Sequence, residues 1–92
     1  SMAPLLSTIE VDSPDFLKVY PNPVSNELQV SVSSYLTDDH IELRSISGKV
    51  IATRRVSGNV TTLNVGDLQT GTYILTYLSV AETRHEKVMI QR

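Results

Sequence analysis

The stretch TYILTYL at residues 72–78 carries the clearest strand signal in this chain of 92 residues. Its β-branched and aromatic residues favour a pleated strand, and its length is typical of one. Apolar side chains occupy both of its faces: Tyr73, Leu75 and Tyr77 on one, and Ile74 and Leu78 on the other. A strand that is apolar on both faces is typical of the middle of a covered sheet. We therefore expect a central strand that is buried on both sides.

Shorter runs with a period of two residues lie on both sides of this stretch. They predict strands at residues 18–20, 27–33, 41–44, 49–56, 60–65 and 83–92. The expected inward positions are Leu28, Val30, Val32, Leu63, Val65, Val88 and Ile90. Short strands about every ten residues, separated by turns such as Ser47-Gly48, are typical of a β-sandwich. A barrel gives the same pattern, but we favour two packed sheets. The prediction is an all-β fold, a seven-stranded antiparallel β-sandwich of the immunoglobulin-like (Ig-like) kind.

The first 17 residues show no sustained period and are read as preceding the domain. Ser1-Met2 is interpreted as a cloning scar, and residues 3–17 as a linker, because two prolines and three acidic residues interrupt them. The domain itself is expected at residues 18–92. Near its start, Pro21-Asn22-Pro23 lacks two amide donors. It therefore predicts a rigid, kinked edge segment in place of a central strand.

Composition and charge exclude several classes of function. The eight Lys and Arg residues are outnumbered by ten Asp and Glu residues, for a net charge of −2. Nucleic-acid binding needs a basic surface and is disfavoured, so no nucleic-acid partner is expected. No apolar run approaches the roughly 18 residues of a membrane-spanning helix, so we expect no transmembrane segment. The chain has no cysteine, which excludes disulfides, thiolate metal sites and a thiol nucleophile.

Few residues in the chain are of the types that carry out catalysis or bind metals. His40 is expected in a turn beside Asp38 and Asp39, and His85 points outward on the last strand. We interpret the Asp-Asp-His group as a solvated loop, because zinc needs three or four ligands from well-spaced positions. Calcium remains an alternative, since it takes oxygen ligands from loops. The loop aspartates are Asp12, Asp15, Asp38, Asp39 and Asp67. We expect no enzymatic activity, no cofactor and no bound metal.

Three blocks of sequence, in this order, resemble one known family. They are VYPNPVSNEL at residues 19–28, IELRSISGKV at 41–50 and LNVGDLQTGTYIL at 63–75, followed by Lys87-Val88 in a closing strand. Together they are similar to the C-terminal sorting domain, type A, of the type IX secretion system, also called the Por secretion system. The second block departs from the family, where an aromatic residue and then an acid often precede the glycine.

The resemblance implies a sorting signal at the end of a larger protein of the Bacteroidota. Such a domain is in transit in the periplasm and then reaches the cell surface or is secreted. The implied partners are the type IX secretion machinery, a cell-surface sortase that commonly removes the domain, and the N-terminal cargo of the same precursor. Cleavage would fall in the linker at residues 3–17. The sorting-motif residues are Tyr20, Pro21, Asn22, Pro23, Gly48, Lys49, Leu68, Gly71, Tyr73, Lys87 and Val88.

Most of these motif residues also have an architectural interpretation. Gly48 and Gly71 are expected in turns, Leu68 at one end of the sandwich and Tyr73 in a wall of the core. Direct contact with the machinery is expected instead at the Pro-Asn-Pro edge and the last strand, where unpaired backbone groups invite an added strand. A basic group on one hairpin is read as solvated, with a partner surface as the alternative: Arg44, Lys49, Arg54 and Arg55. The rival function is an Ig-like adhesion or spacer module that stays on the mature protein.

Overall fold

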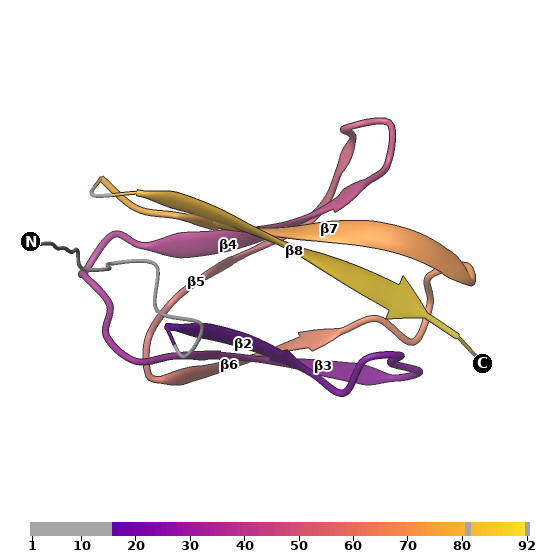
Figure 1. Cartoon of the computed structure of the whole chain (residues 1–92), viewed down its shortest axis with the longest axis horizontal. Coiled ribbons are helices and arrows are strands. Elements are labelled where there is room, and N and C mark those ends of the chain that lie inside the picture. The colour runs from indigo at the N-terminus through magenta and orange to yellow at the C-terminus, as the bar shows by residue number, and fades with distance from the viewer. Residues whose placement is uncertain (1–15, 81, 92) are drawn as a thin grey trace, which may run out of the picture.

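Two antiparallel sheets pack face to face in the computed structural model, which describes residues 16–80 and 82–91 (Figure 1). The smaller sheet has the order β2-β3-β6. Its strands are β2 (Leu17–Tyr20), β3 (Glu27–Val32) and β6 (Val60–Asn64). The larger sheet has the order β5-β4-β7-β8. Its strands are β4 (His40–Ser45), β5 (Val50–Arg55), β7 (Gly71–Leu78) and β8 (Thr83–Ile90). The expected seven-stranded antiparallel sandwich is confirmed for the described residues, which contain no helix.

The core lies between the two sheets and is built mainly from alternate residues of the strands other than β5. It consists of Leu17, Val24, Leu28, Val30, Val32, Ile41, Leu43, Val56, Leu63, Val65, Leu75, Tyr77, Val88 and Ile90. Every inward position that the alternation predicts belongs to this cluster. Because successive side chains of a strand point to opposite faces, one apolar residue in two is enough to fill a two-layer core.

Strand β7 differs from its prediction on one face. It is central, as expected, because it pairs with β4 and with β8. Leu75 and Tyr77 are fully buried, but Ile74 and Leu78 on the opposite face are only half-buried. The expectation of burial on both faces is wrong, because among the described residues each sheet is covered only by the other. The outer face of β7 therefore presents apolar side chains to the surroundings.

The sandwich begins two residues earlier than predicted. Leu17 is 5% exposed and opens β2 opposite Val32. Phe16 packs edge-on against Tyr77 with ring centroids 5.5 Å apart, and the Arg84 guanidinium lies 4.8 Å from the centre of the Phe16 ring. These contacts place the last two residues of the expected linker in the domain. The rest of that linker, the expected cloning scar and Arg92 lie outside the described residues.

The β4–β5 hairpin turns at Gly48, as the sequence predicts. Gly48 has a φ of +97°, a left-handed conformation that other residues adopt only with strain. The turn is closed by the Gly48 amide, which donates to the Ser45 carbonyl at 2.9 Å, and by the Ser45 amide, which donates to the Lys49 carbonyl at 2.9 Å. A shift in register between Leu43 and Arg44 precedes the turn. The tip of this hairpin projects away from the sandwich (Figure 1).

Candidate recognition site

Three of the motif blocks meet at one end of the sandwich. Val24 forms a parallel bridge with Ile90 of β8. On the other side of β8, Ile90 pairs with Gly71 and Val88 pairs with Tyr73. The Pro-Asn-Pro block, the start of β7 and the end of β8 are therefore neighbours, although up to 67 residues separate them in sequence.

Residues 21–24, which we call the proline segment, bind the outer edge of β8. The Asn22 side chain makes two hydrogen bonds: its Nδ2 donates to the Lys87 carbonyl at 3.1 Å, and its Oδ1 accepts from the Met89 amide at 3.0 Å. The Val24 amide then donates to the Met89 carbonyl at 2.8 Å, and the Gln91 amide donates to the Val24 carbonyl at 2.9 Å. Both prolyl peptide bonds, at Pro21 and Pro23, are cis. The segment thus takes the place of a neighbouring strand along the C-terminal half of β8.

This arrangement corrects the expectation of an open edge. The backbone groups of β8 that point away from β7 belong to alternate residues. The Lys87 carbonyl, both backbone groups of Met89 and the amide of Gln91, just after the strand, are bonded to the proline segment. In residues 16–80 and 82–91 no partner is found for the outward backbone groups of Thr83 and His85 or for the Lys87 amide. The proline segment and the C-terminal half of β8 therefore bind each other, and the N-terminal half of β8 stays an edge that could receive an added strand.

Replacing Asn22 should expose one particular amide. In Asn22→Ala the Met89 amide loses its acceptor, and we expect its hydrogen exchange to accelerate at least tenfold. Asn22→Asp is the matched control, because a carboxylate still accepts from Met89 although it cannot donate to the Lys87 carbonyl. Amide exchange followed by NMR tests this. Equal protection of Met89 in Asn22→Ala and in the wild type would contradict the side-chain contact.

The third motif block stabilises the same end of the sandwich through the turn that precedes β7. Leu68 is half-buried against the core, and its amide donates to the Val65 carbonyl at 3.1 Å. The Tyr73 hydroxyl donates to the Gln69 carbonyl at 2.8 Å, so this side chain holds the turn against the strand that follows it. Gly71 was expected in the turn, but it is the first residue of β7. Leu68 and Tyr73 thus have architectural contacts, as predicted.

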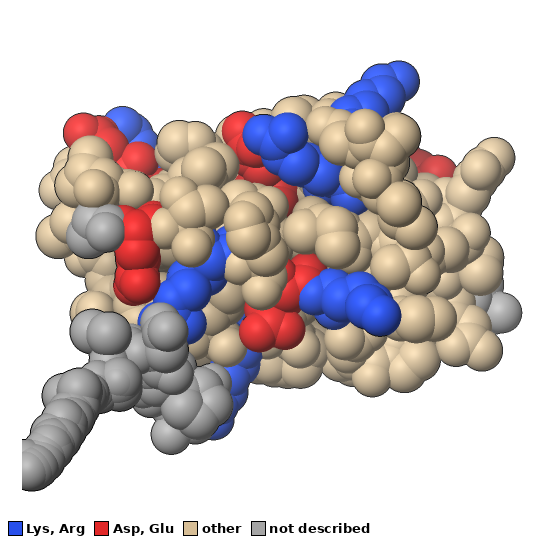
Figure 2. Space-filling view, turned by 45° about the horizontal axis from the view of Figure 1, so that its top comes forward, with Lys and Arg blue, Asp and Glu red and all other residues tan. Residues whose placement is uncertain are grey.

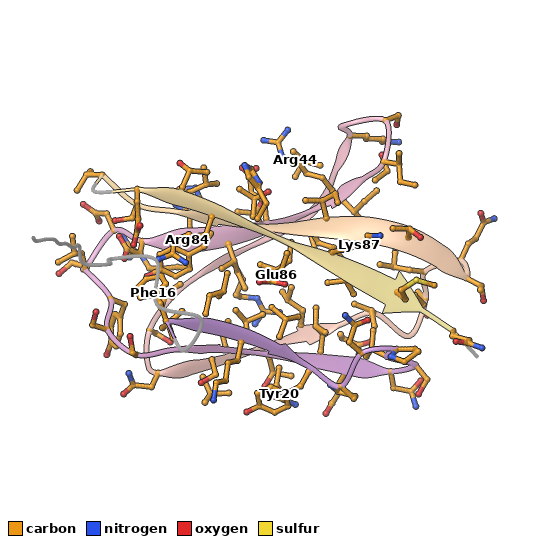
Figure 3. The ribbon with its side chains drawn as sticks, in the orientation of Figure 1. Phe16, Tyr20, Arg44, Arg84, Glu86 and Lys87 are labelled. Atoms are coloured by element: carbon orange, nitrogen blue, oxygen red, sulfur yellow. The ribbon has the colours of Figure 1, made fainter. Side chains whose placement is uncertain are left out.

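Lys87 and Val88 are adjacent but have opposite environments. Val88 is fully buried and faces the core, so it has no surface for a partner to contact. Lys87 is exposed on the outer face of the sheet, opposite Ile74. Figure 3 shows Lys87 and the preceding residue, Glu86, on opposite sides of β8. Of Lys87 and Val88, only Lys87 is therefore available for recognition.

Gly48 and Lys49 lie apart from the other motif residues, on the projecting hairpin. The Arg44 guanidinium donates to the Gly48 carbonyl at 3.2 Å and to Glu42 Oε1 at 2.6 Å and 3.0 Å. Arg44 is therefore charge-compensated within the sheet. Lys49 is exposed and has no ion pair within the described part of the chain. The structure thus divides the predicted site residues between the proline segment with β7 and β8, and the hairpin.

Asp39 is a buried structural residue, although its sequence context predicts a solvated loop. It is only 3% exposed, and its Oδ2 accepts hydrogen bonds from the Tyr77 hydroxyl and, at 2.9 Å, from the Leu36 amide. Burial alone would raise the pKa of Asp39, but these donors hold that pKa below its usual value. Burial and the Asp39 carboxylate raise the pKa of Tyr77. The signal that could have revealed the pair is Tyr77 itself, since a buried tyrosine hydroxyl needs a partner.

The histidines and acids of the described residues do not gather into a metal-binding group. His40 is the first residue of β4, where its Nδ1 lies 3.3 Å from the Asp38 carbonyl oxygen. His85 lies on β8 with its Nδ1 3.1 Å from Thr76 Oγ1. On the face shown in Figure 2, acidic and basic side chains are interspersed, without a continuous basic area. No helix in residues 16–80 or 82–91 has the length and apolar character needed to cross a membrane.

Fold and site together define a small Ig-like β-sandwich whose motif blocks fix a proline segment onto its last strand. A family model described as the secretion system C-terminal sorting domain matches residues 18–91. The chain belongs to this family of type IX secretion sorting domains. No curated protein matches the sequence. Membership makes the domain a C-terminal sorting signal that is attached to a cargo, interacts with the secretion machinery and is exported across the outer membrane.

Proposed function

We propose that the domain is a non-enzymatic signal that passes through the periplasm with its cargo and is removed by a sortase at the cell surface. The observation that carries this proposal is the family match over residues 18–91. The compact sandwich supports it, because the domain packs its own core and can be separated from a cargo. Residues 3–15 precede the first described contact, and this proposal places the cut among them.

The sandwich restricts where the cut can fall. A protease needs an extended, accessible segment of chain. Leu17 is buried in β2, Phe16 packs on Tyr77, and the Ser33 amide donates to the Phe16 carbonyl at 3.0 Å. Cutting at these residues would require the edge of the sheet to open. The bond cut by the sortase is therefore proposed to lie before Phe16.

A reporter fusion tests the proposal. Residues 3–92 are attached to the C-terminus of a fluorescent protein that folds in the periplasm, in a host with a type IX system. We expect the reporter at the cell surface or in the medium, and mass spectrometry should show that it ends within residues 3–15. The matched control carries residues 16–92 alone, which should still direct export but resist removal.

Two results would contradict the proposal. A reporter with residues 3–92 that stays in the periplasm would exclude a complete sorting signal. A reporter that reaches the surface and keeps the whole domain would favour the adhesion or spacer module instead, because a retained module need not be separable.

A further inference from the structure

A groove lies on the outer face of the larger sheet, between the β4–β5 hairpin and strands β7 and β8. Its volume is about 300 Å³, at the lower end for ligand pockets. We call it the outer groove; its principal lining residues are Ile46, Gly48, Ile74, Thr76, Leu78 and His85. The proline segment and the core do not contribute to it, so it is separate from the contacts between the proline segment and β8.

The floor of the outer groove is an apolar row along β7. Ile74 and Leu78 are four residues apart on one face, about 13 Å at the usual strand rise of about 3.3 Å per residue. Thr76 lies between them, is 3% exposed and has its Oγ1 beside His85 Nδ1. An extended peptide repeats its side chains at the same spacing. The floor therefore fits an extended chain with apolar residues at alternate positions.

The hairpin supplies an apolar wall that has no role in the core. Ile46 is 73% exposed at its tip. The turn that carries it is held by the Gly48 backbone, by the contact of Ser45 Oγ with Ser47 Oγ at 2.8 Å, and by the bond from Arg44 to the Gly48 carbonyl. A large apolar side chain fixed in an exposed position next to an apolar floor is typical of an interaction surface.

The rim of the outer groove carries two cations beside Ile74, although the whole chain has a net charge of −2. Ile74 lies between Arg44 on β4 and Lys87 on β8 in the register of the sheet, and Figure 3 shows these two cations on the same side of it. Arg44 is paired with Glu42. Lys87 forms no ion pair with any residue that the structure describes. Such a rim is complementary to carboxylates.

We propose that the outer groove binds an extended acidic segment of a protein of the secretion machinery. Apolar side chains of this segment lie on Ile74 and Leu78 beside Ile46, and a carboxylate of the segment contacts Lys87. The inference rests on the proposed function as a sorting signal and names the chemistry of the partner at one surface. A second copy of this chain fits less well, because a symmetric pairing would bring two positive rims together.

The test compares two double variants in the reporter fusion. The groove variant is Ile46→Asp with Lys87→Glu. The matched control is Val60→Asp with Arg54→Glu, which makes the same changes of chemistry at exposed residues on β6 and β5. We expect surface display to fall at least tenfold in the groove variant and to stay within twofold in the control. Melting temperatures of the purified domains should lie within a few degrees of the wild type in both, and Lys87→Glu alone serves if the double variant unfolds.

A folded groove variant that is displayed as well as the wild type would overturn the groove proposal alone. A wild-type fusion that stays in the periplasm would overturn the sorting function and the groove proposal with it. Binding in vitro is tested with a synthetic peptide of alternating Leu and Glu, against a Leu-Lys peptide of equal length. We expect the acidic peptide to bind the wild type at least tenfold more tightly than the groove variant. Equal binding of both peptides would overturn the proposal that the partner segment is acidic.

Two further measurements test other occupants of the outer groove. Sedimentation equilibrium of the wild type and the groove variant reports on a second copy. Co-sedimentation with phosphatidylglycerol vesicles reports on an anionic membrane. We expect a monomer and no vesicle binding, which would support a protein segment as the occupant. A dimer, or binding to vesicles, that is lost in the groove variant would overturn the proposal that a protein segment occupies the groove.

Discussion

Replacing Asp39 with alanine should lower the free energy of unfolding by about 3 kcal/mol. The substitution removes the acceptor of the Tyr77 hydroxyl and of the Leu36 amide, and the hydroxyl is left in the core without a partner. A hydrogen bond to a charged group contributes about 1.5–3 kcal/mol, and an unsatisfied buried group costs about 1–3 kcal/mol. Chemical denaturation of the isolated domain measures the difference.

The same pair also predicts how stability depends on pH. The pKa of Asp39 is lower in the folded state than its usual value of 3.8. The unfolded state therefore binds the proton more readily, and this contribution to stability is present above about pH 4 and is lost as the pH falls through the folded pKa. Tyr77→Phe should destabilise less than Asp39→Ala, because it removes one donor and leaves the Leu36 bond. An Asp39→Ala variant within 0.5 kcal/mol of the wild type at pH 7 would refute a stabilising pair.

The strands could be predicted because their information is local. Leu28, Val30 and Val32 alternate with polar residues, and a half-buried strand in a two-layer sandwich needs that alternation and little else. The same reasoning failed for β7, where Ile74 and Leu78 have the apolar character of a second buried face. A sequence pattern reports which side chains are apolar, but not whether a second layer of the fold lies over them.

The contacts of the candidate site depend on distant parts of the chain. The prolines beside Asn22 correctly exclude a central strand, but the partners of its amide, at Lys87 and Met89, lie 65 and 67 residues away. Asp39 likewise meets Tyr77 across 38 residues. Neither partner is visible in a local pattern, because side-chain hydrogen bonds across the fold follow from topology and register. This is why the motif residues were predicted and their contacts with one another were not.

Deleting residues 86–92 should abolish cooperative folding. The deletion removes Val88 and Ile90, both fully buried, and all of the pairing between β8 and the first half of β7. It also removes every described hydrogen-bond partner of the proline segment on β8. Burial of each such side chain is worth roughly 1.5–3 kcal/mol, against about 5–15 kcal/mol for a whole domain. Thermal unfolding followed by circular dichroism should show no transition.

Point substitutions on the same strand separate the loss of the fold from the loss of recognition. Ile90→Ala should cost about 2–5 kcal/mol, whereas Met89→Ala, its exposed neighbour, keeps the backbone bonds to Asn22 and Val24 and should cost less than about 1 kcal/mol. If export requires the folded sandwich, reporter display should fall in Ile90→Ala in proportion to the folded fraction and stay unchanged in Met89→Ala.

A truncated domain that still melts cooperatively near the wild-type temperature would show that the end of β8 is dispensable for folding. If truncation then abolished export, the cause would have to be the loss of a contact surface on the removed residues. Lys87 is the exposed cation among those of them that the structure describes.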